Sequence, residues 1–195
     1  ADVLMKRIGG PGALTAWLDS KHLTGMRIDR YERELQPESF GMASFRPDWR
    51  DPAVYSAVRA RIPAATRMAA MRAYLADPRD TATPRGMVEF LQKLDRRELV
   101  SAGSTDRILD YMRRNPGGVN RFRAGFPSDS VFAHRTGASG VDQGLSLAHN
   151  DAGILTLADR RRYAIAGFLT GSTADEAQRD SIFARVARAA VVAIG

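Results

Sequence analysis

Two short stretches of the sequence combine residue types that could act on a small molecule. Carboxylates and guanidinium groups alternate over Arg27–Leu35, and a positioned carboxylate of this kind can activate a water for hydrolysis. In His134–Gly137, Arg135 stands next to Thr136, and a cation beside a hydroxyl suits a carboxylate ligand. Charged runs are usually solvated faces, so neither stretch establishes a site by itself.

Other kinds of chemistry are poorly supported. The chain has no cysteine, which excludes disulfides, thiolate metal sites and a cysteine nucleophile. Its three histidines are His22, His134 and His149, and no two of them stand at metal-ligand spacing with a carboxylate partner. We therefore expect no metal and no other cofactor, and we expect a structural role for His134.

The composition is that of a globular protein. Of the 195 residues, 44% are apolar and 26% are charged, which excludes a disordered chain and a collagen-like repeat. The 29 basic and 22 acidic side chains give a net charge of +7, which permits nucleic acid or a membrane surface as a partner. The basic residues form no compact stripe with aromatic residues, so a nucleic-acid-binding module ranks last. No apolar run approaches the roughly 20 residues that a membrane span needs.

The first part of the chain indicates helices. Residues 1–8 resemble the last turns of a helix, and Gly9-Gly10 followed by Pro11 ends it and starts the next. Residues 21–51 show no sustained apolar period and predict a long loop. Two helices separated by Pro63 are expected between Asp51 and Asp77. Later helices are expected to start at Thr83-Pro84 and at Ser101 or Ser104, the last one ending at Asn115.

Beyond residue 118 the pattern indicates strands. Short apolar or alternating runs cover 131–133, 151–157 and 163–169, with a hairpin tip expected at Ala158–Arg161. A capping box at Thr173–Glu176 precedes a closing helix, whose apolar face is predicted to hold Ile182, Phe183, Val186, Ala190 and Val191. Helices followed by an antiparallel meander and a terminal helix predict an α+β fold.

Three segments, in order, resemble the class A serine β-lactamase family. Arg27–Leu35 resembles the Ω-loop of that family, and Asp77–Pro84 resembles the end of the same loop. His134–Gly137 is similar to the family's Lys-Thr-Gly strand motif. Further agreement comes from 8–18, 121–125 and 168–172, so that the resemblance covers nearly the whole chain except residues 37–76.

The resemblance implies roles for the residues of the loop. Glu32 would be the general base that activates the water for deacylation of a serine ester. Arg30 and Asp80 would form the salt bridge that holds the two ends of the loop. Gln36 stands where the family has Asn, whose amide helps Glu32 to hold that water. The extra methylene of Gln36 could shift the water by about an ångström, so deacylation could be slow.

The resemblance also implies a substrate-binding strand. Arg135, Thr136 and Gly137 would bind the carboxylate of the substrate, with Arg135 in place of the usual Lys. Ala138 would supply one backbone N–H of the oxyanion hole. Arg121 matches a family position at which an arginine reaches toward the same carboxylate. The alternative for Arg121 is an ordinary surface arginine.

Two departures from the family are expected to matter. The family's Ser-x-x-Lys and Ser-Asp-Asn motifs do not occur in residues 1–195, and the alignment places Ala1 just after Ser-Asp-Asn. We therefore expect an N-terminal part of the same protein, with the nucleophilic serine, to be missing from this chain. The loop between Glu32 and Asp80 is enlarged by an insertion at about 39–74, which could act as a lid.

The resemblance predicts a β-lactamase or penicillin-binding-protein transpeptidase-like fold, with a helical domain and an antiparallel sheet flanked by helices. Residues 1–116 would be the rest of the helical domain, and 117–195 the C-terminal strands and closing helix. The predicted function is β-lactam hydrolysis by a monomer that is periplasmic or secreted. The alternatives are a D-Ala-D-Ala peptidase or penicillin-binding relative, and a catalytically silent binding protein.

Overall fold

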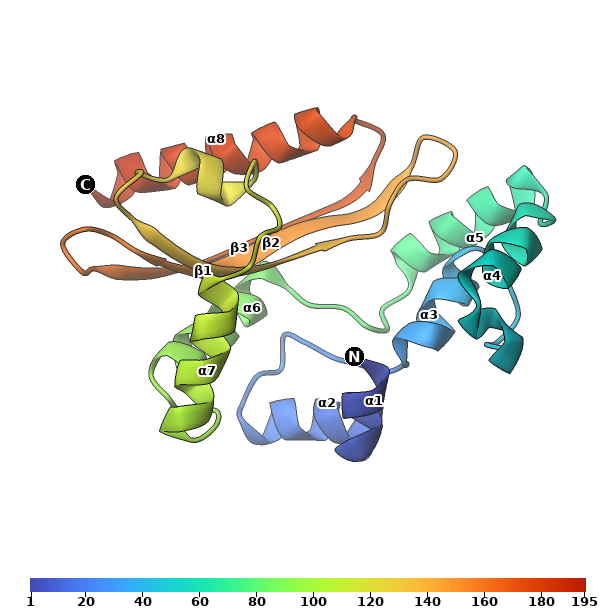
Figure 1. The fold of residues 1–195 in the computed structure, drawn as a ribbon, viewed down its shortest axis with the longest axis horizontal. Coiled ribbons are helices and arrows are strands. Elements are labelled where there is room, and N and C mark those ends of the chain that lie inside the picture. The colour runs from blue at the N-terminus through green and yellow to red at the C-terminus, as the bar shows by residue number, and fades with distance from the viewer. The chain divides into compact units, whose positions relative to one another are not determined.

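The computed structural model describes residues 1–195 and divides them into two compact units, Ala1–Ala82 and Thr83–Gly195. The first unit is built mainly of helices, and the second combines helices with a three-stranded antiparallel sheet (Figure 1). The predicted α+β class is thus confirmed. No helix combines the length and the apolar character that crossing a bilayer requires.

In the first unit, prolines and capping residues set the helix boundaries. Pro11 and Pro52 occupy first helical positions, and the Asp51 side chain accepts a hydrogen bond from the N–H of Ala53. Pro63 separates two helices, as predicted. The elements are α1 (Asp2–Arg7), α2 (Pro11–Ser20), α3 (Glu32–Ser39), η1 (Pro47–Arg50), α4 (Pro52–Ala60) and α5 (Ala64–Ala76).

Helix α3 contradicts the prediction of an uninterrupted loop over residues 21–51. The Asp2 carboxylate accepts hydrogen bonds from the backbone N–H groups of Glu32 and Arg33, at 2.9 and 3.2 Å. The Glu34 carboxylate accepts another from the N–H of Tyr31 at 3.0 Å. These acceptors satisfy the unpaired N–H groups of the first turn. Because Asp2 lies thirty residues away in the sequence, no local pattern reveals this cap.

The second unit is a sheet with helices on both faces. Its strands are β1 (Val131–Ala138), β2 (Ser146–Thr156) and β3 (Arg162–Ser172), in the order β1-β2-β3. Helix α8 (Glu176–Ile194) and the short helix η2 (Phe122–Gly125) lie on one face, and α6 (Pro84–Asp95) and α7 (Ala102–Arg113) lie on the other (Figure 1). The strands are longer than the predicted runs, and β1 includes Arg135–Ala138.

The compact units divide at residue 82, whereas the sequence suggested a division at 116–117. Helices α6 and α7, assigned from the sequence to 1–116, pack against β3 and β1 in the second unit. Leu91 and Leu94 of α6 and Leu109 of α7 are buried, and the local pattern does not contain the positions of the strands they meet. Within this chain α6 and α7 therefore group with the sheet, and the division into a helical domain and a sheet domain stays a prediction.

The core of the second unit lies between the sheet and α8. It is formed by Phe122, Phe132, Leu155, Phe183 and Ala187, with the rings of Phe122 and Phe183 in an edge arrangement 5.0 Å apart. The α8 face was predicted only in part. Phe183 is buried, but Ile182 and Val186 are 41% and 49% exposed. The cap is Asp175 with Gln178, and not the segment beginning at Thr173.

Gly125 marks the closest approach between η2 and α8. A Cβ at this position would clash with the carbonyl oxygen of Ala184 and lie 2.6 Å from the Cβ of Ala187. Both obstacles belong to α8 and cannot rotate away. Close contact between η2 and α8 thus requires a residue without a side chain.

We expect Gly125→Ala to lower the free energy of unfolding by about 1–3 kcal/mol, because the helix must shift to accept the methyl group. Urea unfolding measures the change. The matched control is Gly103→Ala in α7, where an added Cβ meets nothing within 4 Å and no loss is expected. Equal stability of the two variants would contradict this account of η2 packing.

Candidate active site

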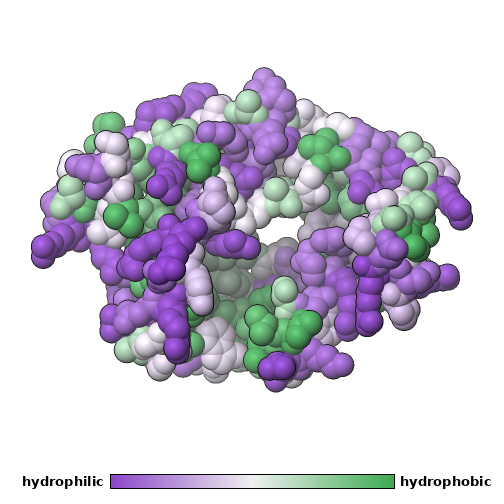
Figure 2. Space-filling model, viewed as in Figure 1, coloured by the Kyte–Doolittle hydropathy of each residue, from purple (hydrophilic) through white to green (hydrophobic).

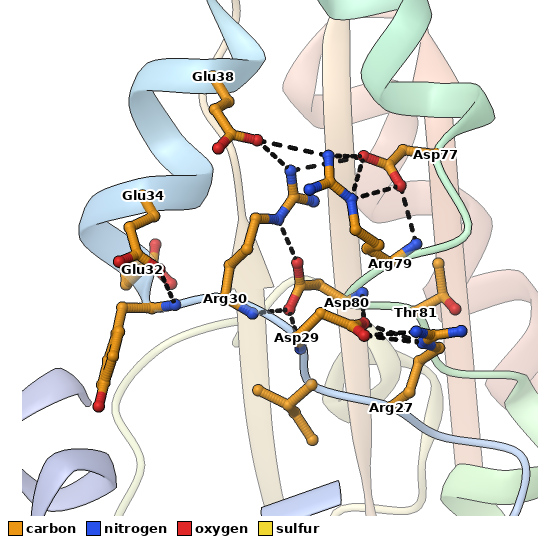
Figure 3. Close-up of polar contacts among 12 residues, drawn as sticks. Arg27, Asp29, Arg30, Glu32, Glu34, Glu38, Asp77, Arg79, Asp80 and Thr81 are labelled. Carbon is orange, nitrogen blue, oxygen red and sulfur yellow. Dashed lines mark hydrogen bonds and ion pairs between the residues drawn. The ribbon is translucent and has the colours of Figure 1, made fainter. Parts of the chain in front are cut away.

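The guanidinium of Arg30 joins three carboxylates from two parts of the first unit, Glu38 of α3 and the segment 77–80. Its Nε donates to Asp80 Oδ2 at 2.6 Å, and its Nη1 donates to Glu38 Oε2 at 2.5 Å (Figure 3). Nη1 also lies 3.4 Å from Asp77 Oδ2. Only 7% of the Arg30 side chain is exposed. Arg30 and Asp80, which the resemblance pairs, thus form an ion pair that two further carboxylates surround.

Backbone hydrogen bonds join the same two segments. The N–H groups of Asp29 and Arg30 donate to Asp80 Oδ1 at 2.7 and 2.9 Å, and the N–H of Asp80 donates to Asp29 Oδ2 at 2.8 Å. The N–H of Arg27 donates to the carbonyl oxygen of Thr81 at 2.9 Å. These bonds hold Asp29–Arg30 and Asp80 together, so the segment between Arg30 and Asp80 forms a loop whose two ends are fixed to each other.

Two further arginines, both exposed, form ion pairs with Asp29 and Asp77 (Figure 3). Arg27 binds Asp29 through two nitrogens, and the Nη2 of Arg79 donates to Asp77 at 2.6 Å. The Arg27 side chain, together with the N–H of Asp80, lowers the pKa of Asp29 below its usual value. The Arg79 side chain and backbone N–H hold the pKa of Asp77 well below its usual range. Sequence reasoning missed Asp29, Glu38 and Arg79, because it paired Arg30 with Asp80 alone.

Glu32 and Gln36 lie one turn apart on the exposed side of α3. The Nε2 of Gln36 donates to Glu32 Oε1 at 2.6 Å. Glu32 is the first residue of the helix, and its backbone N–H is held by Asp2. The carboxylate is therefore exposed to solvent on a rigid element, with an amide group beside it.

The second predicted set of residues lies at the edge of the sheet in the second unit. Arg135, Thr136, Gly137 and Ala138 form the last half of β1, which is an edge strand. Arg135, Thr136 and Gly137 line a cavity of about 570 Å³, together with apolar residues of α6 and α7. The turn at Gly118 fits tightly against the side chain of Thr136. A cation, a hydroxyl and a cavity thus occur together here.

A row of buried polar side chains connects β1 to its neighbours. His134 is fully buried, and its Nδ1 lies 2.8 Å from Asp151 Oδ1 on β2. Its Nε2 lies 3.4 Å from the amide nitrogen of Asn115. A neutral imidazole that donates from Nδ1 and accepts at Nε2 satisfies both contacts. This geometry agrees with a structural role for His134, but no local sequence pattern indicates Asp151 as its partner.

Arg121 is not a surface arginine, because only 7% of it is exposed. Its Nη1 donates to the carbonyl oxygens of Asn150 and Gly137 at 2.6 and 3.2 Å, and its Nε donates to Asp180 of α8 at 3.2 Å. Its Nη2 lies 3.4 Å from the Nδ1 of His149. Arg121 therefore ties β1 and β2 to α8, and each of its three guanidinium nitrogens faces a protein group. The contact with a substrate carboxylate stays a prediction.

The predicted residues therefore form two sets, each in its own compact unit. Direct contacts join Arg30 to Asp80 and Glu32 to Gln36 in the first unit. In the second unit Arg121 contacts the backbone of Gly137.

Comparison with known proteins identifies relatives along the whole chain. Residues 1–194 match the sequence model of the family described as the β-lactamase enzyme family. The carbapenem-hydrolyzing β-lactamase KPC of Klebsiella oxytoca is 28% identical over 195 residues, covering 100% of this chain and 53% of that protein. The β-lactamase SME-1 of Serratia marcescens is 25% identical over 194 residues, covering 99% of this chain and 53% of that protein. The chain thus spans about half the length of the curated relatives it matches.

Solved structures agree with this assignment. A β-lactamase from Chitinophaga pinensis superposes with a TM-score of 0.73 and 25% identity, covering 100% of this chain and 59% of that one. The class A β-lactamase of the last common ancestor of Gram-negative bacteria gives a TM-score of 0.71 and 29% identity, covering 99% and 58%. The fold and the sequence therefore point to the same family.

We expect Arg30→Ala to lower the free energy of unfolding by about 3 kcal/mol, because it leaves buried carboxylates without their cation. The matched control is Arg27→Ala. Half of the Arg27 side chain is exposed, and an exposed ion pair contributes about 1 kcal/mol or less. Urea unfolding of the two variants measures both changes, and equal losses would contradict a central role for Arg30.

Stability should also fall in acid. Because the pKa values of Asp29 and Asp77 are lowered in the folded state, their stabilisation is complete above the ordinary carboxyl pKa of about 4. It is lost as the pH falls through the lowered values. Urea unfolding at a series of pH values from 7 to 2 should show a shallower acid loss in an Asp29→Asn/Asp77→Asn double variant than in the parent. Parallel curves would show that these carboxylates do not drive the loss.

Proposed function

Because the chain belongs to the class A serine β-lactamase family, we propose that the protein containing it hydrolyses β-lactams through a serine acyl-enzyme. Glu32 is the general base of deacylation in this proposal. The observation that supports it most directly is the solvent-exposed Glu32 carboxylate on the first turn of α3, with the Gln36 amide 2.6 Å away. The Gln36 amide bonds directly to Oε1, so the proposed water is held by the other carboxylate oxygen of Glu32, Oε2.

The acylating serine has to come from outside residues 1–195, since no Ser-x-x-Lys sequence occurs within them. Its Oγ loses its proton and attacks the lactam carbonyl, the lactam C–N bond breaks, and the leaving nitrogen takes up a proton, which gives an ester with the opened lactam. Glu32 then takes a proton from a water, and the oxygen of that water attacks the ester carbonyl. The tetrahedral intermediate collapses with return of the proton to the serine Oγ, which releases the hydrolysed product.

The strand residues bind the substrate in this proposal. Arg135 and Thr136 bind the carboxylate of the β-lactam, for which the fork of a guanidinium offers two parallel N–H donors. The backbone N–H of Ala138 stabilises the oxyanion of the tetrahedral intermediate. The Arg30–Asp80 pair keeps the chain that carries Glu32 in one conformation. We further propose a monomeric enzyme in the periplasm or outside the cell.

One observation favours the alternative of a slow or silent penicillin-binding relative. In the structure the Gln36 amide donates directly to Glu32 Oε1, so it competes with water for that oxygen. A protein of this kind would be acylated and then release the acyl group slowly. Acylation without turnover in the parent protein would support the alternative.

We expect Glu32→Gln in the complete protein to slow deacylation by about 10²–10⁴-fold, because the amide cannot accept the proton of the water. Mass spectrometry after mixing with benzylpenicillin should show an acyl-enzyme that persists. The matched control is Glu176→Gln, the same change at an exposed first residue of another helix, α8. If the Glu32→Gln adduct disappears as fast as that of the parent, Glu32 is not the base.

A further inference from the structure

The insertion at about 39–74 concentrates positive charge. It contains six arginines but only two acidic residues, Asp48 and Asp51, so its net charge is +4 within a chain of net charge +7. The carboxylate of Asp51 accepts a hydrogen bond from the N–H of Ala53 and caps α4, so one of the two acidic groups is already in use. Less than a fifth of the chain thus carries more than half of its net charge.

Four of these six arginines are exposed and have no ionic partner. Arg46 and Arg50 lie at the two ends of η1, Arg61 lies at the end of α4, and Arg72 lies on α5. None of the four side chains forms an ion pair, in contrast to the three arginines that hold the two ends of the loop. The insertion therefore presents several guanidinium groups that are available to an anionic partner.

The aromatic side chains of the insertion pack against its own residues. Phe45, Trp49 and Tyr55 form an aromatic cluster, in which Trp49 meets the other two rings edge to face at 6.5 and 6.2 Å. Phe40 is 9% exposed, and the guanidinium of Arg59 lies 3.8 Å from its ring centre. Single-stranded nucleic acid is bound by exposed rings on which bases stack. The insertion thus offers charge while its rings are engaged in internal packing.

Apolar side chains lie among the arginines on these helices. Leu75 of α5 is 38% exposed, and Ile62 and Met68 are partly buried. Figure 2 shows hydrophilic residues along the outer edge of α4 and α5, with apolar residues between them. Arginines interspersed with apolar groups are typical of a protein surface that lies on a lipid bilayer, where the cations meet headgroup phosphates and the apolar groups enter the boundary below them.

We propose that the insertion is a docking surface for a membrane that contains anionic phospholipids. The fork of each guanidinium offers two parallel N–H donors to a headgroup phosphate. One arginine close to an anionic surface raises the binding constant about fivefold, so four of them together give about 10²–10³-fold. None of these arginines takes part in the proposed hydrolysis. The insertion therefore places the enzyme at a membrane surface without entering its chemistry.

Two pairs of arginines give matched variants. Arg61→Gln/Arg72→Gln removes two exposed cations of the insertion. Arg185→Gln/Arg188→Gln makes the same change in net charge at two exposed arginines of α8, in the second unit. None of the four side chains is buried or part of an ion pair, so both variants should fold as the parent does.

The main experiment sediments the complete protein with lipid vesicles. We expect binding to vesicles of equimolar phosphatidylglycerol and phosphatidylcholine, weakening as the salt concentration rises, and no binding to phosphatidylcholine alone. The insertion variant should bind about 25-fold more weakly than the parent, and the α8 variant should stay within about twofold of it. No binding to the anionic vesicles, or equal losses in the two variants, would overturn the proposal.

Two further measurements separate this surface from nucleic-acid binding and from the active site. If the parent binds a duplex or single-stranded oligonucleotide more tightly than the anionic vesicles at the same salt concentration, the lipid assignment is wrong. Hydrolysis of benzylpenicillin in the absence of vesicles should be equal in the parent and in both variants. A loss of hydrolysis confined to Arg61→Gln/Arg72→Gln would place these arginines in the active site and contradict a separate docking surface.

Discussion

The guanidinium of Arg30 is a permanent charge that is almost completely removed from water, and carboxylates around it make this possible. Glu38 comes from α3 and Asp77 and Asp80 come from the segment that follows α5, and each has an oxygen within ion-pair distance of it. Removing charges from water is costly unless partners replace the lost hydration. The first unit therefore depends on these stretches meeting at one point, and α3 with Glu32 begins two residues beyond it.

This junction also explains how a long insertion can be accommodated. The side chains of Arg30 and Asp80 close a loop of fifty residues, and the entropy cost of such closure grows only slowly with length. The chain between them is free to form α4, α5 and an aromatic cluster, provided that it returns to Asp80. The insertion then changes the surroundings of Glu32 without changing the anchor of its helix.

The second unit uses buried polar groups to orient its edge strand. His134 of β1 pairs with Asp151 of β2, and Arg121 links Gly137 of β1 to Asp180 and His149 through contacts of 3.2 to 3.4 Å. Each of these groups would be unfavourable alone in the protein interior. Together they fix the register and direction of β1, and hence the positions of Arg135 and Thr136 at the cavity. The strand that is proposed to bind substrate is thus held in place by buried polar contacts.

The sequence alone determined the elements whose signals lie in contiguous residues. Pro63 separated two helices, Asn115–Gly118 ended α7, and the turn at Ala158–Arg161 joined two strands, because backbone preferences act within a few residues. The sequence also pointed to Glu32, through its resemblance to a family. Only the tertiary structure decided that Asp2 caps α3, that Glu38 and Asp77 join the Arg30 cluster, and that Arg121 is buried. These outcomes depend on which distant groups meet a given charge or N–H, and a local pattern contains no information about partners thirty or fifty residues away.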